Sequence, residues 1–203
     1  MNYSIIIPVF NEERSIPQFL FEIEQYSIDN EIIFINDGST DKSKELLSKP
    51  NFIKYLENNS NCGKGHAIKR GLNQAKYDKI LIIDCDLELK TDELVKLMIL
   101  NNNIGINIAL GSRFRSINPF KSIWNFGNYF LSLVFNWRND IHISDPLCCA
   151  KTFFKKDINV NQIKSNSFDI DVEITTKLIK LHKAHIEHLT YYRRKTNEGK
   201  KLK

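Results

Sequence analysis

Three carboxylates at alternate positions follow a short aliphatic run in this sequence. Residues 80–83 are Ile-Leu-Ile-Ile, and Asp84, Asp86 and Glu88 come directly after them. Because side chains alternate sides along an extended segment, the three carboxylates can share one face. Crowded carboxylates repel one another unless a cation lies among them. The spacing therefore predicts a divalent-cation site at the end of a buried strand.

The same carboxylates also have a structural explanation, which is a turn followed by the cap of the next helix. Thr91-Asp92-Glu93 already offers a cap and an acidic first turn for a helix over residues 91–100, so the cation site is favoured. Residues two apart in a strand lie about 7 Å apart along it, too far for one ion to bind all three carboxylates of an extended segment. We therefore expect Asp86 to be the direct ligand, with Glu88 brought in by a bend.

A second chemical signal is Gly63-Lys64-Gly65, which precedes a helical pattern reaching about residue 75. It could be only a tight turn, but glycines let the backbone approach a ligand, and the first N–H groups of a helix are free to bind an anion. Neither a Walker phosphate loop nor a dinucleotide-binding glycine signature is present. Together with the acidic cluster, the lysine indicates a diphosphate bound through Mg²⁺ or Mn²⁺, and hence a nucleoside diphosphate derivative as substrate.

The elements that would position these residues follow from the apolar runs. Buried strands are expected over residues 3–8, 32–35, 52–56, 80–84 and 106–110, and helices over 15–26, 63–75, 91–100 and around 44–47. Pro8 is expected to close the first strand. Strands alternating with helices imply right-handed βαβ units, so the fold class is α/β, with a mainly parallel central sheet and helices on both faces.

Polar residues stand where such a sheet binds its ligands, beyond the carboxyl ends of the strands. The expected ends at 8–12, 36–39, 84–86 and 111–113 all carry polar or turn residues. Asp37 belongs to one of them. Its carboxylate could accept hydrogen bonds from a base or a ribose, and an Asx-turn is the structural alternative.

The chain of 203 residues is long enough to bury a core, and no repeat or linker divides it. We expect a single domain over 1–203, with a nucleotide-binding half at 1–112 and an acceptor-side half at 113–203. The four cysteines, at 62, 85, 148 and 149, lack zinc-site spacing and favour a reducing compartment. The strand pattern begins within three residues of the N-terminus, and no apolar run reaches the ~18 residues of a spanning helix, so a cytoplasmic location is expected.

Residues 119–138 are rich in aromatic side chains and have basic ends at Lys121 and Arg138. Two interpretations stay open, a core helix and an interfacial amphipathic segment with Trp and Tyr at the level of the lipid headgroups. The second would give a peripheral contact with the inner face of the cell membrane. The net charge of +5 includes a basic run near the C-terminus, which suits a solvated end or a contact with phosphate or anionic lipid.

The order and spacing of several motifs resemble family 2 glycosyltransferases. They are SIIIPVFNE (4–12), NDGSTD (36–41), GKG (63–65), DCDLE (84–88), GSRF (111–114), Asn128, DPLCCAK (145–151), FDIDVE (168–173), YYRR (191–194) and EGKK (198–201). The resemblance covers about residues 3–201 and is strongest to the polyprenyl-phosphate branch, similar to dolichyl-phosphate mannosyltransferases. It implies a GT-A fold, a GDP- or UDP-sugar donor, Mg²⁺ or Mn²⁺ as cofactor, and inversion at the anomeric carbon.

The resemblance also implies roles for individual residues. The residues that would hold the nucleotide are Pro8, Asn11, Glu12, Asp37 and Lys64. Asp84 would lie at the ribose or the metal, with Asp86 and Glu88 at the metal. The phosphates of the donor or of a lipid acceptor would be met by Arg113, Arg194 and Lys200. Glu88 is often glutamine in relatives, and Arg193 is an alternative to Arg194. Many relatives continue into amphipathic or spanning helices, whereas this chain stops at Lys203, so recruitment to a membrane would use a membrane-protein partner or residues 119–138.

The acceptor determines which catalytic residues are needed. A sugar hydroxyl needs a general base, for which Asp145 and Asp171 are candidates, with helix capping or a core ion pair as their structural alternatives. A polyprenyl phosphate has a second pKa near ~6, so it is already anionic at neutral pH and needs no strong base. Catalysis then rests on positioning and on neutralising the departing diphosphate, with Asp86 and Arg113 in catalytic roles and Asp145 orienting the acceptor-side loop. We favour the phosphate acceptor because basic residues outnumber an obvious base in the second half.

There are three alternatives to a transferase that acts on a polyprenyl phosphate. One is a family 2 enzyme acting on a sugar hydroxyl in cell-surface polysaccharide or glycolipid synthesis. A sugar-phosphate nucleotidyltransferase is disfavoured because no Gly-rich, Arg-Lys signature follows the first strand, and a non-catalytic GT-A adaptor is disfavoured because every metal-site carboxylate is present. The expected partners are the nucleotide-sugar donor, a lipid-phosphate or glycan acceptor and a membrane surface or membrane protein; nucleic acid is not among them.

Overall fold

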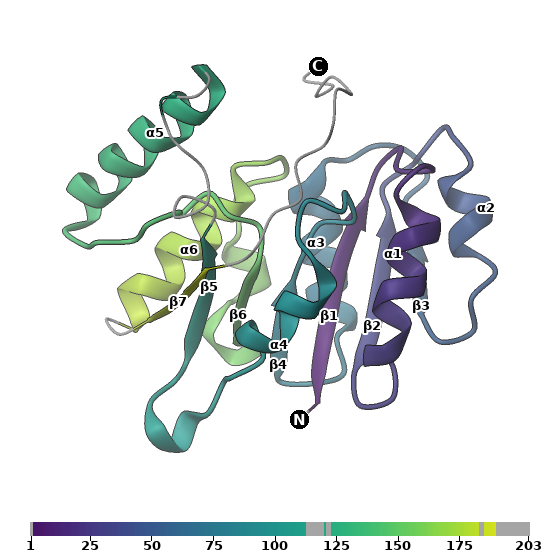
Figure 1. Ribbon diagram of the computed structural model, residues 1–203, viewed down its shortest axis with the longest axis horizontal. Coiled ribbons are helices and arrows are strands. Elements are labelled where there is room, and N and C mark those ends of the chain that lie inside the picture. Colours follow the sequence, from purple (N-terminus) through teal and green to yellow (C-terminus); the bar gives the residue numbers. More distant parts are fainter. Residues whose placement is uncertain (1, 113–119, 121–122, 183–184, 190–203) are drawn as a thin grey trace.

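The computed structural model describes residues 2–112, 120, 123–182 and 185–189 (Figure 1). Within them, seven strands form one sheet in the order β3-β2-β1-β4-β6-β5-β7. The strands are β1 (Tyr3–Val9), β2 (Glu31–Asn36), β3 (Lys54–Glu57), β4 (Lys79–Ile82), β5 (Ile108–Ser112), β6 (Lys151–Phe154) and β7 (Ile186–Leu189). The helices are α1 (Ile16–Ile23), α2 (Ser43–Leu47), α3 (Lys64–Gln74), α4 (Leu94–Leu97), α5 (Ile123–Asn139) and α6 (Ile170–Leu181), together with short 3₁₀ turns.

Most strand pairs are parallel, which confirms the expected α/β architecture. β1 runs parallel to β2 and β4, β2 runs parallel to β3, and β5 runs parallel to β7. β6 is the exception, because it lies antiparallel between β4 and β5. Its residue Lys151 pairs with Ile82 on one side and Leu110 on the other. The carboxyl ends of β1, β2 and β4 therefore lie along one edge of the sheet.

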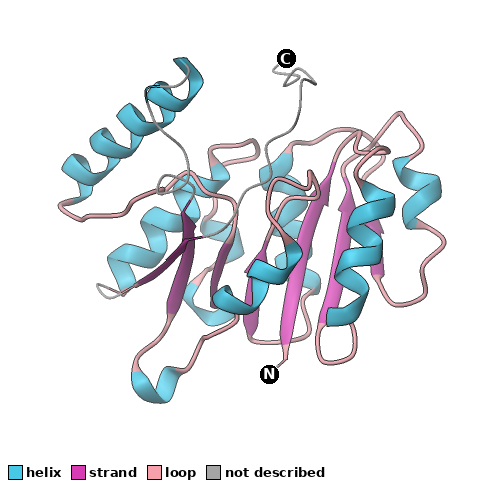
Figure 2. Cartoon of the chain, viewed as in Figure 1, coloured by secondary structure: helices cyan, strands magenta, loops and turns pink. Residues whose placement is uncertain are grey.

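Helices lie on both faces of the sheet (Figure 2). Alternating side chains of the strands build a hydrophobic core on each face. Ile5 and Ile7 of β1 point to the face covered by α1, α2 and α4, where Phe19 packs edge-on against Phe34 with ring centroids 6.0 Å apart. Ile6 points to the opposite face, covered by α3 and α6. Continuous apolar strands are thus explained by burial on both sides.

Several boundaries differ from the sequence expectation. β1 continues past Pro8 to Val9, because the fixed φ of proline suits an extended strand and costs only one ladder donor. β4 ends at Ile82, and β5 begins at Ile108. The helix expected over 91–100 is a 3₁₀ turn (Thr91–Glu93) followed by the single turn of α4. β6 and β7 were not anticipated.

α5 is not a core helix, so that interpretation of residues 119–138 is wrong. Among its described side chains only Ser132 and Phe135 are buried. Its exposed apolar residues are Ile123, Phe126, Phe130, Leu131, Leu133, Val134 and Trp137. Figure 1 shows the helix standing apart from the sheet, beyond α6.

None of the helices in the described part of the chain combines the length and hydropathy needed to cross a bilayer.

Candidate active site

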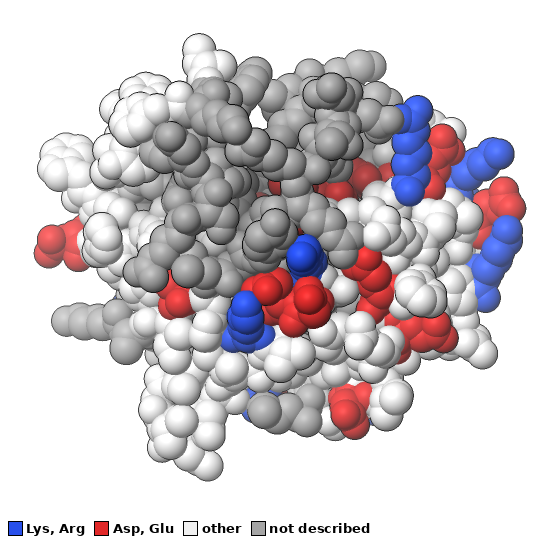
Figure 3. Space-filling model, in the orientation of Figure 1, with Lys and Arg blue, Asp and Glu red and all other residues white. Residues whose placement is uncertain are grey.

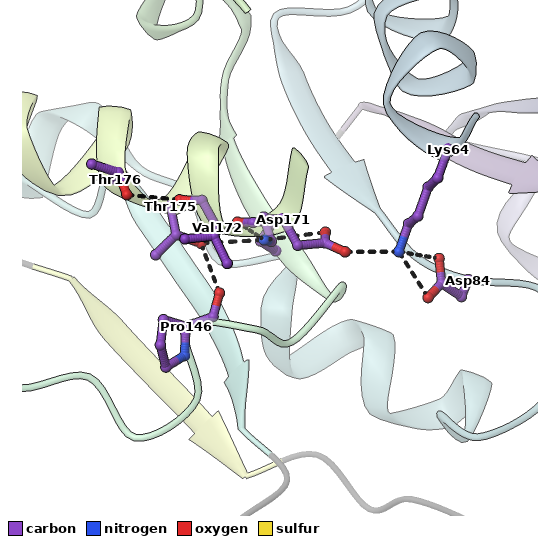
Figure 4. Close-up of polar contacts among 8 residues, drawn as sticks. Lys64, Asp84, Pro146, Asp171, Val172, Thr175 and Thr176 are labelled. Atoms are coloured by element: carbon purple, nitrogen blue, oxygen red, sulfur yellow. Dashed lines mark hydrogen bonds and ion pairs between the residues drawn. The ribbon is translucent and has the colours of Figure 1, made fainter. Parts of the chain in front are cut away.

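Lys64 joins three elements at the carboxyl edge of the sheet. It is the first residue of α3, and its Nζ lies 2.8 Å from Oδ1 of Asp84, just after β4. The same Nζ lies 2.8 Å from Oδ2 of Asp171, in the first turn of α6. Figure 4 shows the ammonium between the two carboxylates. The Lys64 and Asp171 side chains are only 9% and 7% exposed, whereas that of Asp84 is 31% exposed and faces the open side.

A second lysine completes this buried network. Lys151 of β6 is fully buried, and its Nζ lies 3.3 Å from Oδ1 of Asp171. It donates hydrogen bonds to the Asp171 carbonyl at 2.7 Å and to Thr175 Oγ1 at 3.2 Å. A charge this deeply buried is tolerated because it is paired and hydrogen-bonded. Asp171 therefore lies between two lysines, which is the core ion pair considered as its structural alternative.

Proton affinities in the network follow from this pairing. Burial alone would lower the pKa of Lys64, but the Asp84 and Asp171 carboxylates outweigh it and raise that pKa well above its usual value. Burial would raise the pKa of the Asp171 carboxyl, but Lys151 and Lys64 bring it below its usual value. Lys64 and Asp171 are thus ionised at neutral pH.

The two glycines beside Lys64 make room for another part of the chain. Gly63 has φ 96°, and a Cβ there would meet the Asn166 carbonyl oxygen at 2.1 Å. A Cβ on Gly65 would lie 2.6 Å from the Ser165 carbonyl oxygen. The N–H groups of Gly65 and His66 donate to the Asn166 carbonyl at 2.9 and 3.3 Å. The prediction that this helix N-terminus offers free N–H groups to an anion is wrong for these two, because the 165–167 segment occupies them.

Asp37 is used to hold the loop that leads into α3. Its Oδ1 accepts from Asn58 Nδ2 at 2.6 Å and from the Cys62 N–H at 3.1 Å, and its Oδ2 accepts from the Gly63 N–H at 2.7 Å. Asp37 is buried, with only 2% of its surface exposed. The carboxylate thus bridges strand β2 to the loop before Lys64, rather than forming the Asx-turn.

Asn11 and Glu12 connect the ends of β1 and β2. Asn11, at φ 55°, accepts from the Thr40 N–H at 2.8 Å, and its own N–H donates to Ser39 Oγ at 3.0 Å. The Glu12 N–H donates to Ser43 Oγ at 3.0 Å, and its carboxylate accepts from the Ser15 hydroxyl. Pro8, half-buried, lies within β1 opposite Ile35. The structure therefore gathers the expected nucleotide residues along one edge.

The acidic segment after β4 bends at residues 85–87, with Leu87 at φ 59°. The bend was expected, whereas the extended arrangement with three carboxylates on one face is wrong. Asp86 Oδ1 accepts from the Glu88 N–H at 3.0 Å, which closes the turn. Asp84, Asp86 and Glu88 are all half-buried, so this segment is partly exposed to solvent.

This donor set suits a hard divalent cation. Mg²⁺ and Mn²⁺ prefer carboxylate oxygens at partly open sites. The Lys64 ammonium pairs with Asp84, and Asp86 and Glu88 could hold the ion beside it. Among the described residues, the group that brings three potential ligand atoms within 4.8 Å of one another is Asp37, Cys62 and His66, and not the three carboxylates of the acidic turn. There, however, both Asp37 oxygens accept hydrogen bonds from the chain, so we interpret that group as a loop anchor.

Of the remaining predicted site residues, the structure describes Asp145 but not the basic ones. Asp145 is 2% exposed and lies in the loop between α5 and β6, where its carbonyl accepts from the Cys148 N–H at 3.1 Å. Arg113, Arg193, Arg194 and Lys200 lie outside the described residues. Sequence reasoning missed Lys151 as part of the site. A lysine amid apolar residues of a strand was the available signal, because such a charge requires a buried partner.

The face of the molecule seen in Figure 1 is mixed in charge rather than uniformly basic. Figure 3 shows acidic side chains gathered near its middle, with basic side chains among them.

Comparisons with known proteins agree with this geometry. The structure is similar over 98% of its length to glucosyl-3-phosphoglycerate synthase from Mycobacterium tuberculosis in complex with UDP, with a TM-score of 0.75, 16% identity and 73% of that chain covered. Another structure of the same synthase, in complex with Mn²⁺, UDP-glucose and glycerol 3-phosphate, gives a TM-score of 0.72 at 15% identity, over 96% of this chain and 73% of that one. The fold therefore defines the class, which is the GT-A fold of glycosyltransferases.

The chain belongs to glycosyl transferase family 2, whose model matches residues 4–159. The dolichyl-phosphate β-glucosyltransferase of Trichomonas vaginalis is 30% identical over 75% of this chain and 53% of its own length. The undecaprenyl-phosphate 4-deoxy-4-formamido-L-arabinose transferase of Photorhabdus laumondii is 36% identical over 47% of this chain and 32% of its own length. The matches thus span from a third to half of these curated relatives.

Proposed function

We propose that this chain transfers a sugar from a nucleoside diphosphate sugar to a polyprenyl phosphate, with inversion at the anomeric carbon and with Mg²⁺ or Mn²⁺. The observation that carries the proposal is the buried Lys64 ammonium between Asp84 and Asp171, beside the acidic turn at the carboxyl edge of the sheet. The names of the curated relatives support the lipid-phosphate acceptor, and the GT-A neighbours with UDP-glucose and Mn²⁺ support the donor and the metal.

Donor binding is assigned to the edge formed by β1, β2 and β4. Asp86 would hold the metal, with Asp84 shared between metal and ribose and Glu88 as a further ligand. When bound, the ion supplies positive charge that neutralises the diphosphate leaving group. Lys64 supplies a second charge there, and its raised pKa keeps it protonated at neutral pH. Asn11, Glu12 and Asp37 shape the pocket for the nucleoside by fixing the loops around it.

The acceptor is assigned to the α6 side of Lys64. A phosphate acceptor is already anionic, so orientation and charge neutralisation are sufficient. The lowered pKa of Asp171 makes it a weak base, which favours an acceptor that needs none. Buried Asp145 would orient the 145–151 loop, and Arg113, Arg194 and Lys200 remain proposed contacts for phosphate. Exposed apolar residues of α5 suit a peripheral membrane contact at the inner face of the cell membrane.

Donor turnover tests the proposal. Purified protein with Mg²⁺ or Mn²⁺ is offered a panel of UDP- and GDP-sugars, with and without a short polyprenyl phosphate. We expect turnover with one nucleotide class, and a loss of about 100-fold or more in the Asp86→Ala variant because a metal ligand is gone. Removing the metal with EDTA should have the same effect.

Asp92→Ala is the matched control, since Asp92 is an exposed acidic residue of the next turn. It should keep wild-type turnover. Thermal unfolding with nucleotide and metal gives an independent measurement, because a bound ligand raises the melting temperature. A protein that binds no nucleotide with or without metal would fit the non-catalytic adaptor and contradict the enzyme.

A further inference from the structure

A groove of about 1140 Å³ lies between α5, α6 and the 139–147 loop, within the part of the chain that the structure describes. Leu131 and Val134 line it from α5, and Val172, Thr176 and Ile179 line it from α6. The lining is mainly apolar, with Arg138 and Lys180 among its charged members. Its volume is as large as that of sites which enclose drug-sized ligands, about 300–1,000 Å³.

The groove adjoins the candidate active site through two of its lining residues. Phe168 lines the groove, and its ring centroid lies 5.8 Å from the Lys64 ammonium. Pro146 also lines it, and the Pro146 carbonyl accepts a hydrogen bond from Thr175, whose hydroxyl in turn accepts from Lys151 (Figure 4). One end of an apolar groove is therefore next to Lys64, with the fully buried Lys151 behind it.

We propose that this groove holds the first isoprene units of the acceptor chain, with the acceptor phosphate at the Lys64 end. The inference rests on the proposed function and adds the place of the lipid. A phosphate joined to a branched hydrocarbon chain matches a charged site that continues into an apolar groove, because burying the chain removes apolar surface from water. A concave groove between two helices suits a single chain, whereas a membrane or a second copy of the protein would use the exposed outer side of α5.

Acceptor chain length tests the groove directly. The measurement is KM and kcat for geranyl and geranylgeranyl phosphate in detergent micelles, with donor and metal saturating. We expect the longer chain to have the lower KM, because more of it is buried. Leu131→Asp should raise KM for the longer acceptor by about tenfold, since a charge is placed on the apolar lining, and the KM for the donor should stay unchanged.

Leu181→Asp is the matched control. Leu181 is the last residue of α6, is 57% exposed against 52% for Leu131, and is not among the residues that line the groove. It should keep the wild-type KM. Thr176→Phe fills the groove from α6 without adding charge and should also raise KM, which keeps the test decisive if Leu131→Asp folds poorly.

The outcomes separate the two proposals. Equal effects of Leu131→Asp and Leu181→Asp, or a KM independent of chain length in a protein that transfers sugar, would overturn the groove and leave the proposed function standing. If the wild type transfers sugar to no polyprenyl phosphate, the proposed function fails, and equilibrium binding of labelled geranylgeranyl phosphate still decides the groove. If the wild type and Leu131→Asp bind geranylgeranyl phosphate equally well, the groove proposal is overturned.

Discussion

At the scale of single residues, Lys64 is the cation that links the acidic turn after β4 to α6. Its two carboxylate partners come from opposite halves of the chain, Asp84 from the first half and Asp171 from the second. Asp171 also forms an ion pair with a second lysine, Lys151. Charge balance in the site therefore depends on residues that no single motif contains.

Replacing Lys64 by methionine should destabilise the fold. Methionine keeps the volume but leaves Asp84 without its cation and Asp171 with only Lys151. Breaking a buried ion pair costs about 3–5 kcal/mol, and we expect the lower end because Asp84 is partly solvated. Urea unfolding gives the free energy of unfolding, and Lys64→Arg, which keeps the charge, should lose much less. Equal losses in the two variants would mean that the charge itself does not matter.

At the scale of elements, the N-terminus of α3 is built around the close approach of the 165–167 segment. Gly65 has no room for a Cβ because Ser165 and Asn166 backbone atoms lie within 3 Å of its position. The same segment is held to α6 by Glu173, whose carboxylate accepts from the N–H groups of Lys164 and Ser165. Helices α3 and α6 are thus joined through one loop.

Gly65→Ala should lower the free energy of unfolding by about 1–3 kcal/mol, because the backbone of the 165–167 segment must move. Gly127→Ala on α5 is the matched control, since nothing lies within 4 Å of its Cβ position. There the helix propensity of alanine should raise stability by up to about 1 kcal/mol. The prediction is wrong if the two variants change stability in the same direction.

Glu173 should make stability depend on acid pH. Burial would raise its pKa, but hydrogen bonds from the Lys164 and Ser165 N–H groups lower it from 4.5 to about 2. Because the folded pKa lies below the unfolded one, the ionised carboxylate stabilises the fold fully above pH ~4.5, and this contribution is lost as the pH falls toward ~2. Glu173→Gln should cost about 1–3 kcal/mol at pH 7.

A comparison of the wild type with Glu173→Gln checks the sign of this pH dependence. Urea midpoints of wild type and Glu173→Gln are measured from pH 7 down to pH 2, and they should converge at the acid end. A difference that stays constant with pH would show that the hydrogen bonds do not depend on ionisation.

At the scale of the whole molecule, one continuous sheet carries the edge that is proposed to bind the donor, while α5 stands apart from it (Figure 1). Phe130 and Trp137 are 55% and 83% exposed on that helix. Aromatic side chains of this kind partition into the headgroup region of a bilayer. The exposed apolar side chains of α5 therefore suit the proposed contact with a membrane surface.

Flotation with anionic liposomes tests that contact. Phe130→Ser combined with Trp137→Ser should reduce the fraction that floats several-fold, because two apolar anchors are lost. Ile104→Ser is the control, since Ile104 is 68% exposed on a separate turn before β5. Unchanged flotation in the double variant would contradict an interfacial α5.

The sequence by itself determined most elements of the first half of the chain, and the edge at which they present polar residues. The apolar runs that become β1, β2 and β4 are long enough to be recognised locally, and parallel strands necessarily bring their carboxyl ends together. Only the tertiary structure decided which distant groups meet there. Lys64 and Asp171 are 107 residues apart, β6 enters the sheet antiparallel, and the glycines beside Lys64 make room for residues 165–167. Local patterns extend over a few residues, whereas these contacts depend on how the whole chain closes around its two cores.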